Sequence, residues 1–227
     1  MATSTARLGL RKPATSDTVD VALDIAASMD TLDLNYGFRV CTSGTRPGTP
    51  FQGQLIYETD TGDKYFYNGT SWWPIGPLTR VKTADEIVNN SSTLQNDDHL
   101  VVPVTASSRY LWRAFIKLTS ATAADFKLDL SLPAGSSHES VSQWWHRAAA
   151  VGSQAGDERM FNSSSPTTTV PATDGTTTAE LLMGEIHGLI VVAGTAGSVQ
   201  VRWAQNAANV SDTTVYASSW MELVRVS

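Results

Sequence analysis

The 227-residue sequence has a single cysteine, few charged residues and no long apolar run. Cys41 alone cannot form an intrachain disulfide, and no C-x-x-C pair is present for zinc or redox chemistry. The longest apolar run, residues 189–193, is far shorter than the roughly 20 residues that a membrane-spanning helix needs. The N-terminus lacks the apolar stretch of a secretory signal, so we expect neither export by such a signal nor membrane insertion.

Positive charge is also scarce. The formal net charge is −6, and no run of lysine or arginine is present to neutralise phosphates, so we expect no nucleic-acid partner. Only 17% of the residues are charged, below the roughly 25% of an average domain. Serine, threonine, asparagine, glutamine and glycine supply the polarity instead, a composition that favours strands over helices.

Residues 1–37 are predicted to form an N-terminal arm followed by a helix. The arm, residues 1–16, is basic and contains Leu8, Leu10, Arg11 and Lys12. It is either a frayed terminus or a peptide that orders on a partner. Residues 17–34 carry apolar side chains at helical spacing, which include Val19, Ile25 and Met29. An isolated helix of this length is marginal in water, so its apolar face needs a partner.

Residues 38–78 are predicted to form a small three-stranded β-meander. The strands are expected at about 54–59, 64–67 and 71–75, separated by turns whose Gly and Asn residues tolerate positive φ. The last strand contains Trp72 and Trp73, which would point to opposite faces of the sheet. Either could lie in the core or at an interface.

Residues 79–227 are predicted to form an antiparallel β-sandwich. Apolar and aromatic runs alternate with turn residues, and strict alternation places Phe126, Leu128 and Leu130 on one face of a strand. The same pattern places Val199, Val201 and Trp203 on one face of another strand. The polar stretch 152–177 is expected to be a long exposed loop. The fold class is therefore mainly β.

Aromatic residues of the sandwich are further candidates for an interface or a ligand site. Adjacent indoles on a strand face opposite ways, so one of Trp144 and Trp145 should lie in the core and the other at the surface. Trp203, Trp220 and Leu223 are expected on strand faces that association between copies would bury.

No catalytic or metal-ligating constellation is evident. The four histidines are scattered, and Cys41 has no nearby histidine in the sequence to activate it. Paired carboxylates of the kind that a glycosidase uses could come from Asp97, Asp98, Asp125 and Asp129. A turn before a strand explains Asp97 and Asp98 without chemistry. We expect no catalytic residues, no metal and no cofactor.

Three short motifs carry a resemblance to a known class of proteins. They are the turn Ser43 to Pro47, the run GQLIYETDTG at 53–62 and YNGTSW at 67–72. Together with LGLRKP before the helix, they resemble segments of tailed-bacteriophage virion structural proteins, particularly those of actinobacteriophages. The C-terminal part resembles their TNF/C1q-like jelly-roll domains. The motifs cover about 40 residues and are fairly specific.

The resemblance implies a non-enzymatic virion surface protein that is trimeric and assembles in the host cytoplasm. Its N-terminal region would anchor it to phage capsid or tail proteins through Leu8, Leu10, Arg11, Lys12, Val19, Ile25 and Met29. The exposed jelly roll would face a host surface glycan or protein, as in a minor tail or fibre-tip protein. Because no collagen-like or long heptad shaft is present, capsid decoration is the main alternative. A glycan-degrading enzyme and a free-standing C1q-like binding module remain less favoured.

Overall fold

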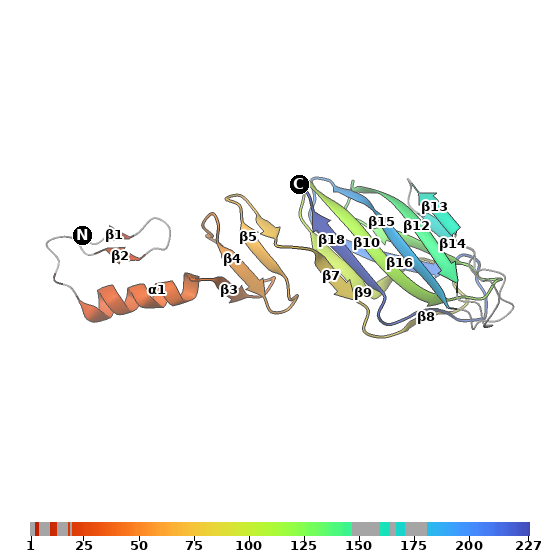
Figure 1. Cartoon of the computed structure of the whole chain (residues 1–227), viewed down its shortest axis with the longest axis horizontal. Helices are drawn as coiled ribbons and strands as arrows, with labels where there is room; N and C mark the ends of the chain where they lie inside the picture. Colours follow the sequence, from red (N-terminus) through yellow and green to blue (C-terminus); the bar gives the residue numbers. More distant parts are fainter. Residues whose placement is uncertain are drawn as a thin grey trace. The chain divides into compact units, whose positions relative to one another are not determined.

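The computed structural model is mainly β and contains one short helical segment, as the composition predicted. It describes residues 3–4, 10–12, 18, 20–146, 159–163, 167–170 and 181–227. The chain divides into two compact units, Met1–Gly76 and Pro77–Ser227 (Figure 1). The division falls two residues before the expected boundary at 78–79, and the arm, the helix and the small sheet belong to one unit.

The first unit begins with a short strand pair and a helix. Strand β1, Thr3–Ser4, pairs antiparallel with β2, Arg11–Lys12. A π-helical segment, Val21–Ala26, continues into helix α1, Ala27–Asn35. The helix ends where Tyr36 becomes extended and donates its N–H to the Leu32 carbonyl at 2.7 Å. The helix was thus predicted nearly to its observed end, whereas Val19 lies outside the described residues.

The sheet of the first unit has four strands rather than the three expected. Strands β4 (Leu55–Glu58), β5 (Lys64–Tyr67) and β6 (Trp72–Pro74) form the predicted antiparallel meander. Strand β3, Phe38–Cys41, adds to β4 in parallel. The turn-rich segment after Cys41 leads the chain back so that β4 can lie beside β3. The additional strand β3 therefore depends on this long connection, which strand periodicity does not reveal.

The buried contacts of this four-stranded sheet are ionic as well as apolar. The buried carboxylate of Glu58 accepts a hydrogen bond from Arg46 Nε, and the Arg46 guanidinium lies 4.3 Å from the centre of the Tyr65 ring. Burial, with the negative charges of Asp63 and Glu58, raises the pKa of Tyr65 to about 12 although Arg46 opposes the shift. The only buried hydrophobic side chains among the described residues of this unit are Ile56 and Tyr65.

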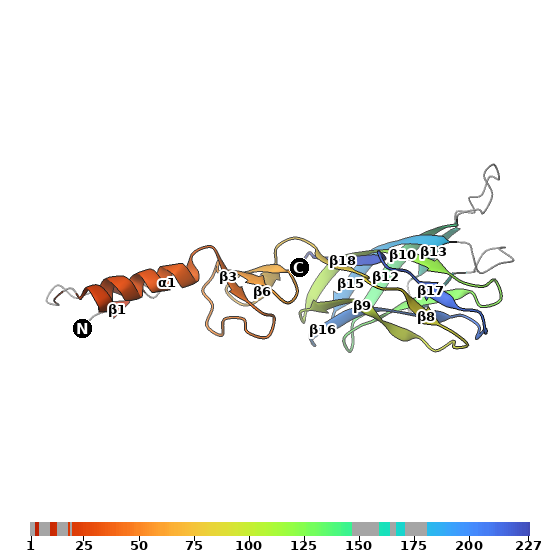
Figure 2. The same cartoon turned by 90° about the horizontal axis from the view of Figure 1, so that it is seen from below.

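The second unit is a sandwich of two antiparallel sheets (Figures 1 and 2). The smaller sheet has the order β14-β11-β16-β9. In the larger sheet, β10 lies between β15 on one side and β18 and β17 on the other; β18 pairs onward with β7, and β17 with β8. Beyond β15 the larger sheet continues with β12 and β13. The strands are β7 Leu78–Val81, β8 Glu86–Val88, β9 Gln95–Val104, β10 Ser108–Thr119, β11 Phe126–Ser131, β12 Ser137–His146, β13 Arg159–Ser163, β14 Thr167–Val170, β15 Leu182–Val192, β16 Gly197–Gln205, β17 Thr213–Val215 and β18 Trp220–Arg225.

Strand pairing in the sandwich is nested. Strand β7 pairs with β18, β9 with β16, β10 with β15 and β11 with β14. Successive members of this series alternate between the two sheets, which is the topology of a jelly roll. The hairpin of β12 and β13 is inserted between β11 and β14 and extends the larger sheet. The prediction of one long loop over 152–177 is therefore wrong, because β13 and β14 form within it.

The core lies between the two sheets and follows the predicted alternation. Phe126, Leu128 and Leu130 of β11 and Val199, Val201 and Trp203 of β16 are all at most 4% exposed. Ala204, the neighbour of Trp203 on β16, is also buried. The rings of Trp144 and Trp203 lie 5.9 Å and 6.0 Å from Phe126, so large aromatic rings from both sheets fill the centre.

Two glycines of β15 make room for core tryptophans. Gly184 lies opposite Trp144, and Gly188 lies opposite Trp112. A Cβ atom on Gly184 would lie 2.3 Å from the Trp144 ring. On Gly188 it would lie 1.9 Å from the Glu139 carbonyl oxygen and 2.8 Å from Trp112 Nε1. The absence of a side chain at these two positions allows the indoles to lie flat against the neighbouring strand.

Candidate interaction surfaces

The larger sheet of the sandwich carries apolar side chains on both faces. On the face away from the core, Leu111 lies between Leu189 of β15 and Val224 of β18. Two rows further along, beyond the row of Arg113 and Glu222, Trp220 stacks beside Phe115 at 6.5 Å between ring centres. Trp220 also pairs with Val81. We call this set the apolar outer face; its residues are Val81, Leu111, Phe115, Leu189, Trp220 and Val224.

The two outer faces of the sandwich differ in chemistry. Leu111 is 51% exposed and Val81 is 52% exposed. On the smaller sheet, the outward positions of β11 and β16 hold Lys127, Gln200 and Arg202, which are half-buried and polar. An antiparallel sheet with one solvated face normally alternates apolar and polar side chains, as the smaller sheet does. The apolar outer face departs from that pattern, and patches of this kind mark interaction sites.

A small charged cluster sits within the apolar outer face. The Arg113 guanidinium lies 3.4 Å from a carboxylate oxygen of Glu185 and 3.4 Å from one of Glu222. It also lies 5.9 Å from the centre of the Trp220 ring. Beside the cluster, β10, β12 and β15 form a shallow open hollow of about 650 Å³ that is lined by residues including Leu111, His187 and Leu189. The arrangement is a charged contact between apolar side chains on one side and the polar residues Glu139 and His187, which also line the hollow, on the other.

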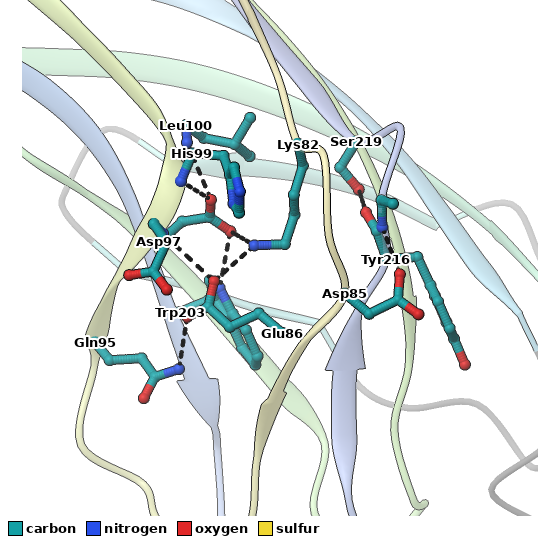
Figure 3. A network of polar contacts seen from close by, with 12 residues as sticks. Lys82, Asp85, Glu86, Gln95, Asp97, His99, Leu100, Trp203, Tyr216 and Ser219 are labelled. Carbon is teal, nitrogen blue, oxygen red and sulfur yellow. Dashed lines mark hydrogen bonds and ion pairs between the residues drawn. The ribbon is translucent and has the colours of Figure 1, made fainter.

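A buried ion pair holds the edge of this face in place (Figure 3). Lys82, which directly follows β7, places its Nζ 2.8 Å from Asp97 Oδ2 on β9 and 2.6 Å from Glu86 Oε2. The side chains of Lys82 and Asp97 are completely buried. Trp203 Nε1 donates to the same Asp97 oxygen at 3.3 Å. The network therefore links the two sheets at their edge.

Backbone contacts join this network to β18. Lys82 donates its N–H to the Ser219 carbonyl at 2.7 Å, and the Ser218 N–H donates to the Lys82 carbonyl at 2.8 Å. Since Val81 and Trp220 are the immediate neighbours of these residues, the ion pair fixes the position of one margin of the apolar outer face. The sequence gives no sign of this role, because lysine after a strand is ordinarily a solvated residue.

The structure separates the four tryptophans that were candidates in the sandwich. Trp144 is 2% exposed and Trp203 fully buried, so both lie in the core and neither is available to a partner. Leu223, also expected at an association face, is fully buried in the core. Trp145 and Trp220 are half-buried on the outer side of the larger sheet. The outward-facing residues of β10 and β18, rather than Trp203, make the surplus apolar surface.

The two tryptophans of the small sheet are both half-buried. Trp72 packs on Tyr67 with 5.2 Å between ring centres, and Trp73 packs on Phe66 with 6.4 Å. Both are thus engaged with neighbours within their own unit and still accessible in part.

The N-terminal candidates lie in exposed surroundings where the structure describes them. Ile25 is 46% and Met29 64% exposed, and Lys12 is exposed. Leu10 is half-buried, and Arg11 belongs to β2. Leu8 and Val19 lie outside the described residues. The apolar side chains of the helix are thus exposed, as their need for a partner predicts.

The candidate catalytic carboxylates do not form a carboxylate pair. Asp97 is bound to Lys82, and buried Asp129 on β11 lies 2.6 Å from Arg202 Nη2 and 3.5 Å from His138 Nε2. Burial opposes ionisation of Asp129, but His138 and Arg202 outweigh it and lower the pKa of this carboxyl. Asp98 is exposed, and Asp125 occupies a turn at φ +50°. Asp97 and Asp129 therefore serve the packing of the sandwich.

Within the described part of the chain, no group of three or more His, Cys, Asp or Glu side chains is placed to hold a metal ion. Among the same residues, no helix has the length and apolar character needed to cross a membrane.

Comparisons with known proteins find distant structural likenesses alone. No protein-family model and no curated protein matches the sequence. Among solved structures, the VP2 subviral particle of infectious bursal disease virus is 12% identical with a TM-score of 0.20, over 82% of this chain and 56% of that chain. The Gx strain structure of that virus is 11% identical with a TM-score of 0.18, over 80% of this chain and 50% of that one. The chain spans about half the length of these proteins, and at such TM-scores the likeness carries no argument about function.

Proposed function

We propose that the chain is a non-enzymatic surface component of a bacteriophage virion whose jelly-roll unit associates as a homotrimer. The observation that carries this proposal is the apolar outer face, whose side chains are exposed or half-buried in the single chain although the outward positions of β11 and β16 on the other sheet are polar. The motifs between Ser43 and Trp72 and the order of arm, helix, small sheet and jelly roll support the virion class. The N-terminal region supplies the anchor, and the sandwich is the exposed part.

Copies of the same chain are the occupant that this face fits best. Its central arginine, Arg113, already has two carboxylate neighbours, so this cation needs no counter-charge from a partner, and the cluster keeps one net negative charge. Burying Leu111, Val81 and Trp220 between copies would remove apolar surface from water at roughly 25 cal/mol for each Å². A face with this chemistry resembles the apolar core of a homo-oligomer interface.

Mass photometry and sedimentation of the full chain test the trimer. We expect a particle of three times the 24.4 kDa chain mass, and dissociation of the Leu111→Asp and Phe115→Asp variants into folded monomers. Val210→Asp is the matched control, because Val210 is 78% exposed and lies outside the apolar outer face. A wild-type chain that stays monomeric at micromolar concentration would overturn the proposal.

Within the virion we favour a minor tail position that faces the host receptor over capsid decoration. The absence of a long shaft leaves both positions open, so binding decides between them. A tail protein should adsorb to host cells through a surface glycan or protein. A decoration protein should bind capsids that lack it. Deletion of residues 1–16 should abolish incorporation in either case and leave the sandwich folded.

A further inference from the structure

Among the described residues of the first unit, more large hydrophobic side chains are exposed than buried. Half of the large hydrophobic side chains that are exposed among the described residues lie within residues 21–40. Four of them follow the helix at spacings of four, four and three residues and form one stripe, which we call the helix stripe: Val21, Ile25, Met29 and Leu32. Since Ile56 and Tyr65 are the only hydrophobic side chains that are buried among the described residues of the same unit, this stripe is a surface that needs cover.

The charge around the helix stripe limits what can cover it. Asp30 and Asp33 are exposed on the helix, Asp20 is exposed directly before the helical segment, and the sequence has no lysine or arginine from residue 13 to residue 38. Packing the helices of several copies against one another would bring only carboxylates together at the margins of the contact. The stripe therefore fits an occupant that is both apolar and basic.

The chain itself contains a segment with that chemistry. Residues 7–12, RLGLRK, hold two leucines and three cations and no acid; we call them the basic arm. Lys12 is exposed, and β2 positions Leu10 directly before the two cations of that strand. The arm is complementary to the helix stripe in both apolar character and charge. In the described residues of one chain, however, the stripe remains exposed although the arm precedes it.

We propose that the basic arm of one copy packs on the helix stripe of a neighbouring copy, so that the subunits exchange their arms. This inference rests on the proposed function in one respect, namely that several chains associate. It adds the contact by which the N-terminal units of the assembly hold one another, separately from the apolar outer face of the sandwich.

Heterotypic disulfide crosslinking tests the contact in the full chain. A Leu10→Cys chain and a Met29→Cys chain carrying tags of different size are co-expressed in a Cys41→Ser background and then mildly oxidised. We expect a crosslinked dimer that contains one chain of each kind. Val210→Cys replaces Met29→Cys in the matched control, since it is even more exposed and lies in the other unit. That pair should give several times less product.

Charge reversal separates a specific contact from chance collision. Lys12→Glu should lower the crosslink yield, and adding Asp30→Lys and Asp33→Lys to the partner chain should restore it. The yield should also fall in 1 M salt, where the screening length drops from about 10 Å at 0.1 M to about 3 Å. A crosslink yield that changes neither with salt nor with these charge reversals would contradict the pairing of the arm with the acidic helix.

The same samples keep the inference distinct from the proposed function. A trimeric mass with no heterotypic dimer, or with only Met29-to-Met29 crosslinks, overturns arm exchange and leaves the trimer intact. A further sample places Leu10→Cys and Met29→Cys in one chain; an internal crosslink there, without heterotypic product from the separate chains, also overturns arm exchange. A monomeric mass overturns the proposed trimer, and heterotypic crosslinks then cannot form.

Discussion

Lys82 Nζ lies 2.8 Å from Asp97 Oδ2 in a place that water does not reach, and this one contact joins the two sheets of the sandwich. The pair is well supported, because Asp97 Oδ1 accepts the N–H groups of His99 and Leu100 at 2.9 Å and 3.0 Å. Glu86 provides the second carboxylate for the lysine. Removing one partner of such a buried pair lowers the stability of a protein more than replacing both partners.

Replacing the lysine alone should destabilise the sandwich strongly. We expect Lys82→Met to lower the free energy of unfolding by about 3–5 kcal/mol, since it leaves the Asp97 carboxylate buried and without its cation. The double variant Lys82→Met/Asp97→Asn should recover part of that loss, because asparagine still accepts from the backbone. Urea denaturation of the three proteins measures the differences, and a loss below about 1 kcal/mol would contradict the role of the pair.

The close approach at Gly188 leads to a steric prediction. Gly188→Ala should cost about 1–3 kcal/mol or more, because its Cβ would overlap the Glu139 carbonyl and push the Trp112 ring aside. Gly194→Ala is the control, since a Cβ there meets nothing within 4 Å. Thermal denaturation should show a lower Tm for the first variant and little change for the second. Equal Tm values would refute the packing of Trp112 against this glycine.

The charged cluster on the apolar outer face should affect assembly more than folding. Arg113→Met retains the aliphatic stem and leaves Glu185 and Glu222 without their shared cation. Arg113 is 53% exposed in the single chain, so the folding cost should stay within about 1 kcal/mol. In an assembly that buries this face, the two carboxylates would be desolvated, and the trimer should dissociate at higher protein concentration than wild type. Sedimentation velocity measures this shift; Lys127→Met, on the polar outer face, should leave it unchanged.

Asp129 should make the stability of the sandwich sensitive to acid. Its folded pKa is lowered by His138 and Arg202 despite burial, so its stabilising contribution is complete above the ordinary aspartate pKa of about 3.9. That contribution is lost as the pH falls from there through the lower folded value. Asp129→Asn should therefore lower the free energy of unfolding at pH 7. Between pH 5 and pH 2 the variant should lose less stability than the wild type, and the difference should be about the contribution of Asp129. Parallel acid titrations of unfolding for the two proteins would show whether their curves converge.

Sequence patterns predicted the features that repeat along a strand. Alternation identified the core faces of β11 and β16 because burial of one face imposes a period of two. The same rule correctly expected one of Trp144 and Trp145 in the core, although it could not say which. The helix was predicted from its apolar spacing. Each of these signals is local, so neighbouring residues suffice to read it.

Features that depend on distant residues were not predictable in this way. Strand β3 depends on the path of the chain around residues 42–54 back to β4. Strands β13 and β14 form within a polar stretch because β12 and β11 present free edges to them. Gly188 looks like an ordinary strand glycine until Trp112 is placed opposite. The burial of Lys82 depends on Asp97, fifteen residues further along the chain.

The position of β18 has a consequence for the order in which the two units can fold during synthesis. This strand, which follows the other described strands of the sandwich in the sequence, lies between β10 and β7 inside the larger sheet. During synthesis β7 must therefore wait for β18 before it can pair, and the jelly roll cannot close until β18 has been translated. The first unit has no such dependence, since β3, β4, β5 and β6 all precede Pro77. The first unit can thus form on the ribosome while the sandwich is still an open sheet with unpaired edges.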